Sequence, residues 1–571
     1  MNALKKLITS TLILFASLLF YSLAYAQVGI PKTYKKAIVV SATKEASEAG
    51  IEVMKEGGNA IDATAAVCFT LAVTYPEAGN IGGGGFMVVR LSNGDVNTLD
   101  FRETAPAGAS RTMYQDKNGN VIKNLSREGA LAVGVPGTVD GMINAVRKYG
   151  KLSLEKDMAP AIRYAQNGYR LSYNNAKALN YYRNKFLRYK GSSQYFTKPD
   201  STLYHEGDLF KQTDLANTLK LIADKGRAGF YSGRTADLIV KEMKKQHGLI
   251  TLKDLKNYHS IWRKPIKAQY DDYNLYMMAP PSSGGIAIKQ ILNMIKPYKI
   301  RRYGFNSAKY IHLMTEAERR VYADRAYYLG DPSFVHMPIK YLTSQSYLKK
   351  RMSTFSWQHA TRSSEVSHGK VPPHYHESTE TTHFSIVDSE GNAVSVTYTL
   401  NGGFGSHVSV TGAGFLLNNE MDDFSAKPGV PNMYGLLGGE ANAIQPHKRM
   451  LSSMTPTIVT KNGKLNMVVG SPGGSTIITT VLQVFMNIAD FGMNVQQAVA
   501  APRVHNQWYP DQIFYDPYSF TNDTKKILNK MGHHLSRRSR YVGEADCIRI
   551  LANGERSGGA DPRGENYTAG Y

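Results

Sequence analysis

The sequence predicts an α+β fold in which a mostly helical region precedes a strand hairpin. Residues from about 140 to 350 show helical periodicity, with Tyr, Lys and Arg on the polar faces. The composition changes over Phe355–Ser378, which is rich in Ser, His, Pro and Glu and is typical of a linker. Beyond it, His383–Asp388 and Ala393–Leu400 alternate apolar and polar residues about the turn Ser389–Asn392, as the strands of a β-hairpin do.

The first 26 residues have the pattern of a cleavable signal peptide. Lys5 and Lys6 form a basic start, Leu12–Leu23 is apolar, and Ala24–Ala26 is a small-x-small cleavage site. A membrane anchor is the alternative, but the apolar stretch falls short of the roughly 20 residues that a spanning helix needs. We therefore expect cleavage after Ala26 and a periplasmic or secreted protein.

Composition narrows the classes of function. The formal net charge is +22, but the Lys and Arg residues are scattered rather than gathered in a stripe, so nucleic-acid binding is not expected. Cys68 and Cys547 are the two cysteines, and no Cys-x-x-Cys pair occurs, which argues against a thiolate zinc site or a redox motif. Composition and spacing leave open whether the two cysteines pair in an oxidising compartment.

The segment Lys36–Ser110 predicts a strand, two helices, a glycine turn and another strand. Gly82–Gly85 followed by the apolar Phe86–Val89 is typical of a tight turn that enters a buried strand. A phosphate-binding loop would require a lysine after the glycines, and none follows. Farther on, Tyr322, Tyr327 and Tyr328 fall in one of the predicted helices.

Histidines in and after the linker raise the question of a metal. His374, His376 and His383 lie close together in sequence, but Glu380 stands where a His-Glu-x-x-His motif beginning at His376 would need its second histidine. We expect a solvated loop here, with no metal and no cofactor.

Thr381 stands where the linker meets the first strand of the hairpin. Folding the hairpin about Ser389–Asn392 pairs Asp388 with Ala393 and places Thr381 opposite Leu400, one residue from Thr399. A bulge or a shifted register would bring the two threonines onto one face. A threonine becomes a competent nucleophile when it begins a chain, because its own α-amine can act as the base.

Several long motifs resemble those of γ-glutamyltranspeptidases over essentially the entire mature chain. They are Gly79–Gly85, Asp100–Glu103, Glu380–Ser385, Asp388–Ala426, Leu451–Thr457, Gly470–Ser475 and Thr568–Tyr571. The resemblance implies a four-layer αββα sandwich of the N-terminal-nucleophile hydrolase type. It also implies autocleavage between Glu380 and Thr381. After removal of signal peptide 1–26, a large subunit 27–380 and a small subunit 381–571 would form a heterodimer that shares one domain.

The resemblance also implies roles for individual residues. Thr381 matches the nucleophile, Thr399 a residue that positions it, and the N–H groups of Gly473 and Gly474 the oxyanion hole. The α-carboxylate of a γ-glutamyl group would be held by Arg102, Ser452 and Ser453, and its α-ammonium by Asn401, Glu420 and Asp423. Forked N–H donors suit a carboxylate and carboxylates suit a cation.

Three places vary within the family pattern. Gly402-Gly403 stands where some bacterial members carry two threonines, which is expected to loosen the substrate wall. Glu420 replaces a glutamine of other members and would hold an ammonium more strongly. Pro428–Gly439, with Tyr434, resembles a lid loop that would close over the site and exclude water.

Two other functions stay open at this point. One is a cephalosporin or glutaryl acylase of the same fold, and the other is an unprocessed periplasmic binding protein without catalysis. An α/β-type serine hydrolase is disfavoured because no Gly-x-Ser-x-Gly motif occurs. From the family we expect glutathione and other γ-glutamyl compounds as donors, and water, amino acids or peptides as acceptors.

Overall fold

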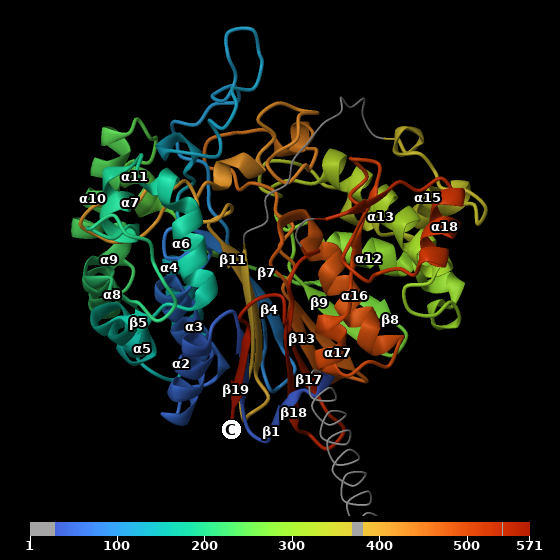
Figure 1. The fold of residues 1–571 in the computed structure, drawn as a ribbon, viewed down its shortest axis with the longest axis horizontal. Helices are drawn as coiled ribbons and strands as arrows, with labels where there is room; N and C mark the ends of the chain where they lie inside the picture. The colour runs from blue at the N-terminus through green and yellow to red at the C-terminus, as the bar shows by residue number, and fades with distance from the viewer. Residues whose placement is uncertain (1–28, 368–380, 539–540) are drawn as a thin grey trace, which may run out of the picture.

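The computed structural model describes residues 29–367, 381–538 and 541–571. The predicted signal peptide, Glu380 and the linker histidines His374 and His376 lie outside these residues. Two seven-stranded antiparallel sheets lie face to face between two helical layers (Figure 1). The predicted four-layer αββα sandwich is therefore confirmed.

The first sheet carries the hairpin at its centre. α3 (Ala60–Thr74) packs behind the hairpin strands, and it begins with a capping box in which Asn59 and Asp62 satisfy each other's backbone N–H groups. In order across the sheet, the strands are β19 (Tyr567–Gly570), β2 (Ile38–Ser41), β10 (Thr382–Val387), β11 (Ala393–Thr399), β3 (Gly84–Arg90), β4 (Val96–Phe101) and β7 (Ile261–Arg263). The helices on this side are α2 (Lys44–Lys55), α3, α4 (Thr138–Tyr149), α5 (Leu154–Asn167), α6 (Tyr173–Phe186), α7 (Lys190–Phe196), α8 (Thr213–Lys225), α9 (Ala228–Tyr231), α10 (Gly233–Lys245) and α11 (Leu252–Asn257).

The second sheet and its helices form the other half of the sandwich. In order, its strands are β1 (Lys32–Tyr34), β18 (Arg556–Ala560), β17 (Asp546–Ile550), β13 (Lys464–Gly470), β12 (Thr457–Lys461), β9 (Tyr273–Met277) and β8 (Ile266–Tyr270). The helices are α12 (Gly284–Ile295), α13 (Ala308–Tyr328), α14 (Ile339–Leu342), α15 (Gln345–Arg351), α16 (Ile477–Ala489), α17 (Val495–Ala500) and α18 (Asn522–Lys530). Two small sheets, β14 (Val504–His505) with β15 (Ile513–Tyr515) and β16 (Leu535–Arg537), and β5 (Tyr169–Arg170) with β6 (Leu209–Phe210), lie outside the sandwich.

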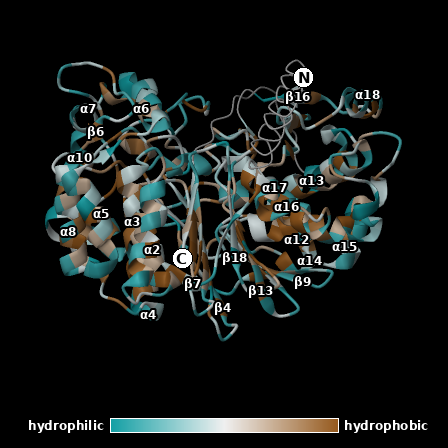
Figure 2. Cartoon of the chain, turned by 60° about the horizontal axis from the view of Figure 1, so that its bottom comes forward, coloured by the Kyte–Doolittle hydropathy of each residue, from teal (hydrophilic) through white to brown (hydrophobic). Residues whose placement is uncertain are grey.

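Apolar side chains fill the space between each pair of layers. Between the sheets, β-branched and small residues such as Val40, Val387 and Ile458 form a thin core. Figure 2 shows hydrophobic residues concentrated in α12, α16 and the neighbouring strands of the second half. Within the described residues, no helix combines the length and the apolar character needed to cross a bilayer.

Both cysteines are buried and unpaired. Cys68 lies in α3 and Cys547 in β17, which belong to different core clusters. The sequence left open whether the two cysteines pair, and in the structure both thiols are free. Burial raises the pKa of each thiol, so neither has the character of a reactive thiolate.

The predicted register of the hairpin is wrong by one residue. Thr382 pairs with Tyr398 and Val387 with Ala393, so the loop has five residues, Asp388–Asn392. Asp388 belongs to the loop because its Oδ1 accepts the backbone N–H groups of Glu390 and Asn392, at 2.9 Å each. The residues that precede Thr382 and follow Tyr398 are Thr381 and Thr399, which therefore face each other.

Two expectations for residues 140–350 need correction. The region is mostly helical, but Ile261–Met277 contributes the strands β7, β8 and β9. The alternation of buried and more exposed residues in β8 and β9 is typical of strands with one buried face. Most charged residues of α13 also do not face solvent; Arg319 and Arg320, for example, are buried and paired with Glu316.

The burial of Asp157 in the helical layer can be tested through protein stability, without an activity assay. It is fully buried in α5, and neither of its oxygens has a hydrogen-bond donor among the described residues. Burial, with a contribution from Asp62, raises its pKa to about 8. The pKa of an Asp in an unfolded chain is about 3.9, so the folded protein binds one more proton than the unfolded chain between about pH 4 and 8. The free energy of unfolding therefore falls as pH rises through that window.

We predict that Asp157→Asn raises the melting temperature by at least ~2 °C at pH 8 and leaves it unchanged at pH 4. Asp237→Asn, at an exposed position of α10, serves as the control and should change neither value. Calorimetry at both pH values tests this. An equal change in melting temperature at pH 4 and pH 8 would contradict the raised pKa of Asp157.

Candidate active site

Thr381 and Thr399 are buried at the end of the hairpin and line one cavity. Ten of the eleven site residues predicted from the sequence line that cavity, and Gly473 is the exception. The lining residues are Arg102, Thr381, Thr399, Asn401, Glu420, Asp423, Tyr434, Leu436, Ser452, Ser453, Met454, Gly474 and Ile477.

Strand ends and tight turns bring these residues together. Arg102 directly follows β4, and Asn401 follows β11 with a positive φ of 78°. Glu420 and Asp423 begin and end a short 3-10 helix, Glu420–Asp423. Ser452 and Ser453 lie just before β12, where Ser452 forms a bridge with Ser282. The site therefore draws on segments that are distant in sequence and lie at the same end of the sandwich.

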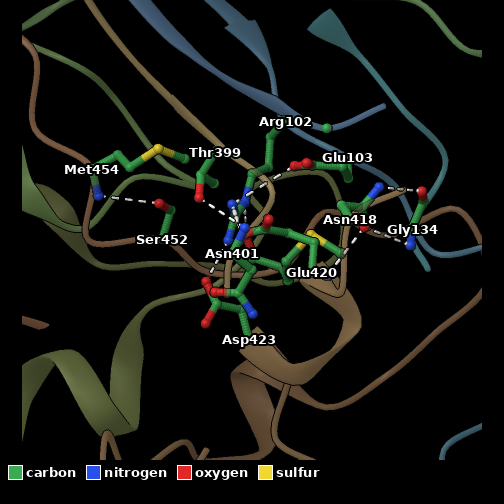
Figure 3. Close-up of polar contacts among 12 residues, drawn as sticks. Arg102, Glu103, Gly134, Thr399, Asn401, Asn418, Glu420, Asp423, Ser452 and Met454 are labelled. Carbon is green, nitrogen blue, oxygen red and sulfur yellow. Dashed lines mark hydrogen bonds and ion pairs between the residues drawn. The ribbon is translucent and has the colours of Figure 1, made fainter. Parts of the chain in front are cut away.

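Arg102 is the electrostatic centre of the cavity. Its side chain is fully buried; Nη1 donates to Glu420, and Nη2 donates to Asp423 Oδ2 at 2.5 Å (Figure 3). Glu103 Oε2 lies 3.7 Å from Nη1, and neither oxygen of Glu103 has a hydrogen-bond partner among the described residues. Burial raises the pKa of Glu103 to about 7, although Arg102 opposes the shift. One guanidinium thus faces three carboxyl groups.

Thr399 is oriented by the turn that follows it. Its Oγ1 accepts the N–H of Asn401 at 2.7 Å (Figure 3), which leaves its own proton for another acceptor. The Asn401 side chain donates to Asn419 O at 3.0 Å, and this bond holds the turn against the next loop. The arrangement is suited to directing the Thr399 hydroxyl across the hairpin toward Thr381.

The turn Gly473-Gly474 requires glycine at both positions. Their φ values are 126° and 57°, and a Cβ on Gly474 would lie 2.4 Å from the Tyr434 ring. Thr476 donates to Gly473 O through its N–H at 3.1 Å and its hydroxyl at 2.8 Å. Because the peptide is planar and trans, the N–H of Gly474 points away from Thr476. Gly474 also lines the cavity.

The loop Pro428–Gly439 covers the cavity. Tyr434 is buried and its hydroxyl donates to Asn401 O at 2.6 Å, while Asn432 donates to Asp423 at 2.9 Å. Gln507, which the sequence analysis did not single out, donates to Tyr434 O at 3.2 Å. The free volume left is about 20 Å³, enough for about one water molecule. A larger ligand needs more room than this arrangement leaves.

The two glycines after Asn401 do not loosen the wall in the way expected from the sequence. Neither lines the cavity. A Cβ on Gly402 would lie 3.2 Å from both the Asn419 amide and the Met433 methyl, so the lid methionine fills the space that a side chain would occupy.

His383 has a structural role in this arrangement. Its ring nitrogens contact the hydroxyls of Thr397 at 2.9 Å and Ser385 at 3.0 Å, and burial lowers its pKa to about 3, so the ring is neutral. No group of three His, Cys, Asp or Glu residues suited to a metal ion occurs within the described ranges.

Sequence reasoning also missed Arg325, which reaches the cavity wall from α13. Its Nη2 donates to Ser453 Oγ at 3.1 Å. Helical periodicity carried no signal for it, because a basic residue beside two tyrosines is typical of a solvated helix face.

Comparison with known proteins shows the family to which the chain is similar. A family model described as Gamma-glutamyltranspeptidase matches residues 46–571. The chain is 47% identical over 543 residues to a glutathione hydrolase proenzyme of Escherichia coli, which covers 95% of this chain and 93% of that protein.

Two solved structures extend the comparison. The cephalosporin acylase from Bacillus halodurans superposes with a TM-score of 0.84 at 27% identity, covering 95% of this chain and 97% of that one. The gamma-glutamyltranspeptidase of Helicobacter pylori is 46% identical with a TM-score of 0.57, covering 60% of this chain and 95% of that one. The fold is thus similar to that of both kinds of protein, while sequence identity is higher to the transpeptidase.

The contact between Gly474 and Tyr434 leads to a prediction with a matched control. Gly474→Ala should expel the Tyr434 ring and expose Pro428–Gly439 to proteases. Gly492 has a similar φ of 67° but no atom within 4 Å of an added Cβ. Gly492→Ala should therefore cost only backbone strain, about 1–2 kcal/mol, and leave the loop protected. Limited proteolysis of both variants measures this, and equal cleavage rates would contradict the proposed packing.

Proposed function

The chain belongs to the gamma-glutamyltranspeptidase family, and on that premise we propose that it is a glutathione hydrolase and γ-glutamyltransferase that cleaves itself before Thr381. The observation that carries the proposal is the position of Thr381. It faces Thr399 in a cavity that also holds a buried guanidinium, two serines, two carboxylates and a backbone donor.

In the proposed processing step, the Thr381 hydroxyl attacks the carbonyl carbon of Glu380. The peptide nitrogen leaves as the α-amine of Thr381, and water then hydrolyses the resulting ester. The products are a large subunit 27–380, once signal peptide 1–26 has been removed, and a small subunit 381–571. Thr381 would then begin a chain and carry its own base, whose unperturbed pKa is roughly 7.7–8.0.

The charges in the cavity suit a γ-glutamyl group, which carries an α-carboxylate and an α-ammonium. Arg102, Ser452 and Ser453 would hold the carboxylate, and Asn401, Glu420 and Asp423 the ammonium. On binding, the carboxylate of the ligand would take the place of Glu420 and Asp423 beside Arg102. The ammonium of the ligand would take the place of Arg102 beside Glu420 and Asp423. Buried charges would thus exchange partners rather than lose them, which limits the desolvation cost.

Turnover would proceed through a covalent ester. The Thr381 oxygen attacks the γ-carbonyl of the donor while the Thr381 α-amine takes up the hydroxyl proton, and N–H groups at Gly473 and Gly474 would stabilise the oxyanion. The amine leaves with a proton from the Thr381 α-amine. Water, an amino acid or a peptide then attacks the γ-glutamyl ester and restores the hydroxyl. We propose that this occurs in the periplasm or outside the cell.

The acylase alternative has less support. The B. halodurans acylase has the same fold but is 27% identical, against 47% for the E. coli glutathione hydrolase proenzyme. A glutaryl group has no α-ammonium, so it would leave Glu420 and Asp423 without a cation. A non-catalytic binding protein would have no need of a threonine at this position in the cavity.

Replacing Thr381 tests the nucleophile. Thr381→Ala should leave an uncut precursor and reduce γ-glutamyl turnover at least ~1000-fold. Thr382→Ala is the matched control: the neighbouring threonine is equally buried, and its Oγ1 has no hydrogen-bond partner among the described residues. It should be cut and active. A denaturing gel and an anilide assay give both readouts, and substantial activity in Thr381→Ala would refute the mechanism.

Donor choice tests the ammonium subsite. Wild type should prefer a γ-glutamyl anilide over a glutaryl anilide, because an unpaired buried carboxylate costs at least roughly 1–3 kcal/mol. Asp423→Ala should lower kcat/KM for the γ-glutamyl donor about 10- to 100-fold and narrow the preference. Glutaryl turnover equal to or faster than γ-glutamyl turnover in the wild type would move the assignment to the acylase.

A further inference from the structure

Arg325 is a buried cation whose hydrogen-bond partners are hydroxyl groups. It lies on α13, is 4% exposed, and forms no ion pair with a carboxylate of the described chain. Its neighbours on the same helix differ, because Arg319 and Arg320 are both paired with Glu316. An arginine keeps its charge when buried, so a guanidinium left in this state usually serves an anion nearby.

The contacts of Arg325 lead to both serines of the cavity wall. Nη2 donates to Ser453 Oγ at 3.1 Å, and Nε donates to Ser283 Oγ at 2.9 Å. Ser283 in turn donates to Ser452 O, through its hydroxyl at 2.6 Å and its N–H at 2.8 Å. One side chain thus holds the Ser452-Ser453 segment, directly at Ser453 and through Ser283 at Ser452.

These bonds decide where the serine protons point. A hydroxyl has one proton to donate, and Ser453 Oγ already accepts from Arg325. Its proton is therefore available to an acceptor in the cavity. Ser452 Oγ likewise accepts the N–H of Met454 at 3.1 Å (Figure 3), which leaves its proton free for the same purpose. Two hydroxyls so arranged form a donor pair suited to a carboxylate.

We infer that Arg325 is a positioning residue for the α-carboxylate of the donor, acting through Ser453 and by its own positive charge. This inference rests on the proposed function. Burial lowers the pKa of Arg325, while Asp423 raises it and Arg102 lowers it, so Arg325 lies within the electrostatic field of the site. Its charge should favour a ligand carboxylate and have little influence at the γ-carbonyl, so the effect should fall on KM rather than kcat.

The test compares two ligands that differ only at the α-carboxylate. Glutamate carries it and 4-aminobutanoate lacks it, and each can be measured as a competitive inhibitor of γ-glutamyl anilide hydrolysis. Arg325→Met should raise the KM of the anilide and the Ki of glutamate about 10- to 100-fold, the expected effect of losing a charged hydrogen bond. The kcat and the Ki of 4-aminobutanoate should stay within about threefold of wild type.

Arg351→Met is the matched control. Arg351 also packs against α13, where it pairs with Asp324, but it does not contact the cavity wall. It should leave both Ki values unchanged. If Arg325→Met does not fold, Arg325→Lys tests the same inference. Lysine keeps the positive charge but lacks the forked guanidinium, so it should raise the Ki of glutamate by a smaller factor and leave the Ki of 4-aminobutanoate unchanged. Each variant is assayed after a gel has established that it is cut like the wild type.

A double variant separates positioning from general damage. Once Ser453→Ala has removed the hydroxyl, adding Arg325→Met should cost less than it does in the wild type. Equal weakening of glutamate and 4-aminobutanoate, a loss in kcat alone, or independent effects of the two substitutions would overturn the inference. Absence of γ-glutamyl turnover in the wild type would instead overturn the proposed function.

Discussion

The pairing of β10 with β11 is the constraint on which the site depends. Side chains alternate along a strand, so the register that pairs Thr382 with Tyr398 puts Thr381, His383 and Ser385 on one face, opposite Thr399, Thr397 and Ser395. His383 contacts Thr397 and Ser385, and Ser395 donates to Val469 O of the other sheet. Both strands are buried on both faces, so a slip of one residue would turn these polar side chains to the opposite face and separate them from their partners. The same bonds therefore favour the register that holds Thr381 across from Thr399.

Charge balance is the second organising feature. Arg102 is surrounded by Glu103, Glu420 and Asp423, whereas Arg325 has hydroxyl partners and no ion-paired carboxylate within the described part of the chain. A ligand that brings one negative and one positive group can satisfy both sets at once. The loop Pro428–Gly439 is part of this charge balance, because Asp423 binds Asn432 of the loop as well as Arg102. A change of partner at Asp423 would therefore alter a contact of the loop. Asp423 is thus the carboxylate that joins Arg102 to the loop Pro428–Gly439.

Motifs predicted which residues meet, but local patterns did not give their geometry. Glu420, Asp423, Ser452 and Ser453 were identified from runs of sequence, and all line the cavity. The hairpin register was predicted wrongly because Asp388 looks like a strand end until its carboxylate is seen to bind the loop N–H groups. Arg325 and Gln507 were missed because their roles arise from tertiary contacts. Neither a basic residue in a helix that contains both polar and apolar residues nor an amide in a loop is marked by sequence periodicity. The burial of α13 comes from the layers packed around it.

The central claim is that Thr381, once it begins a chain, carries the γ-glutamyl group during turnover. The most direct measurement is mass spectrometry of the processed enzyme, quenched in acid soon after mixing with a γ-glutamyl donor in the absence of an acceptor. We predict that the small subunit gains the mass of one γ-glutamyl group and that fragmentation locates it on the N-terminal threonine. A γ-glutamyl group on any other residue, or an intact unprocessed chain that turns over the donor, would contradict it.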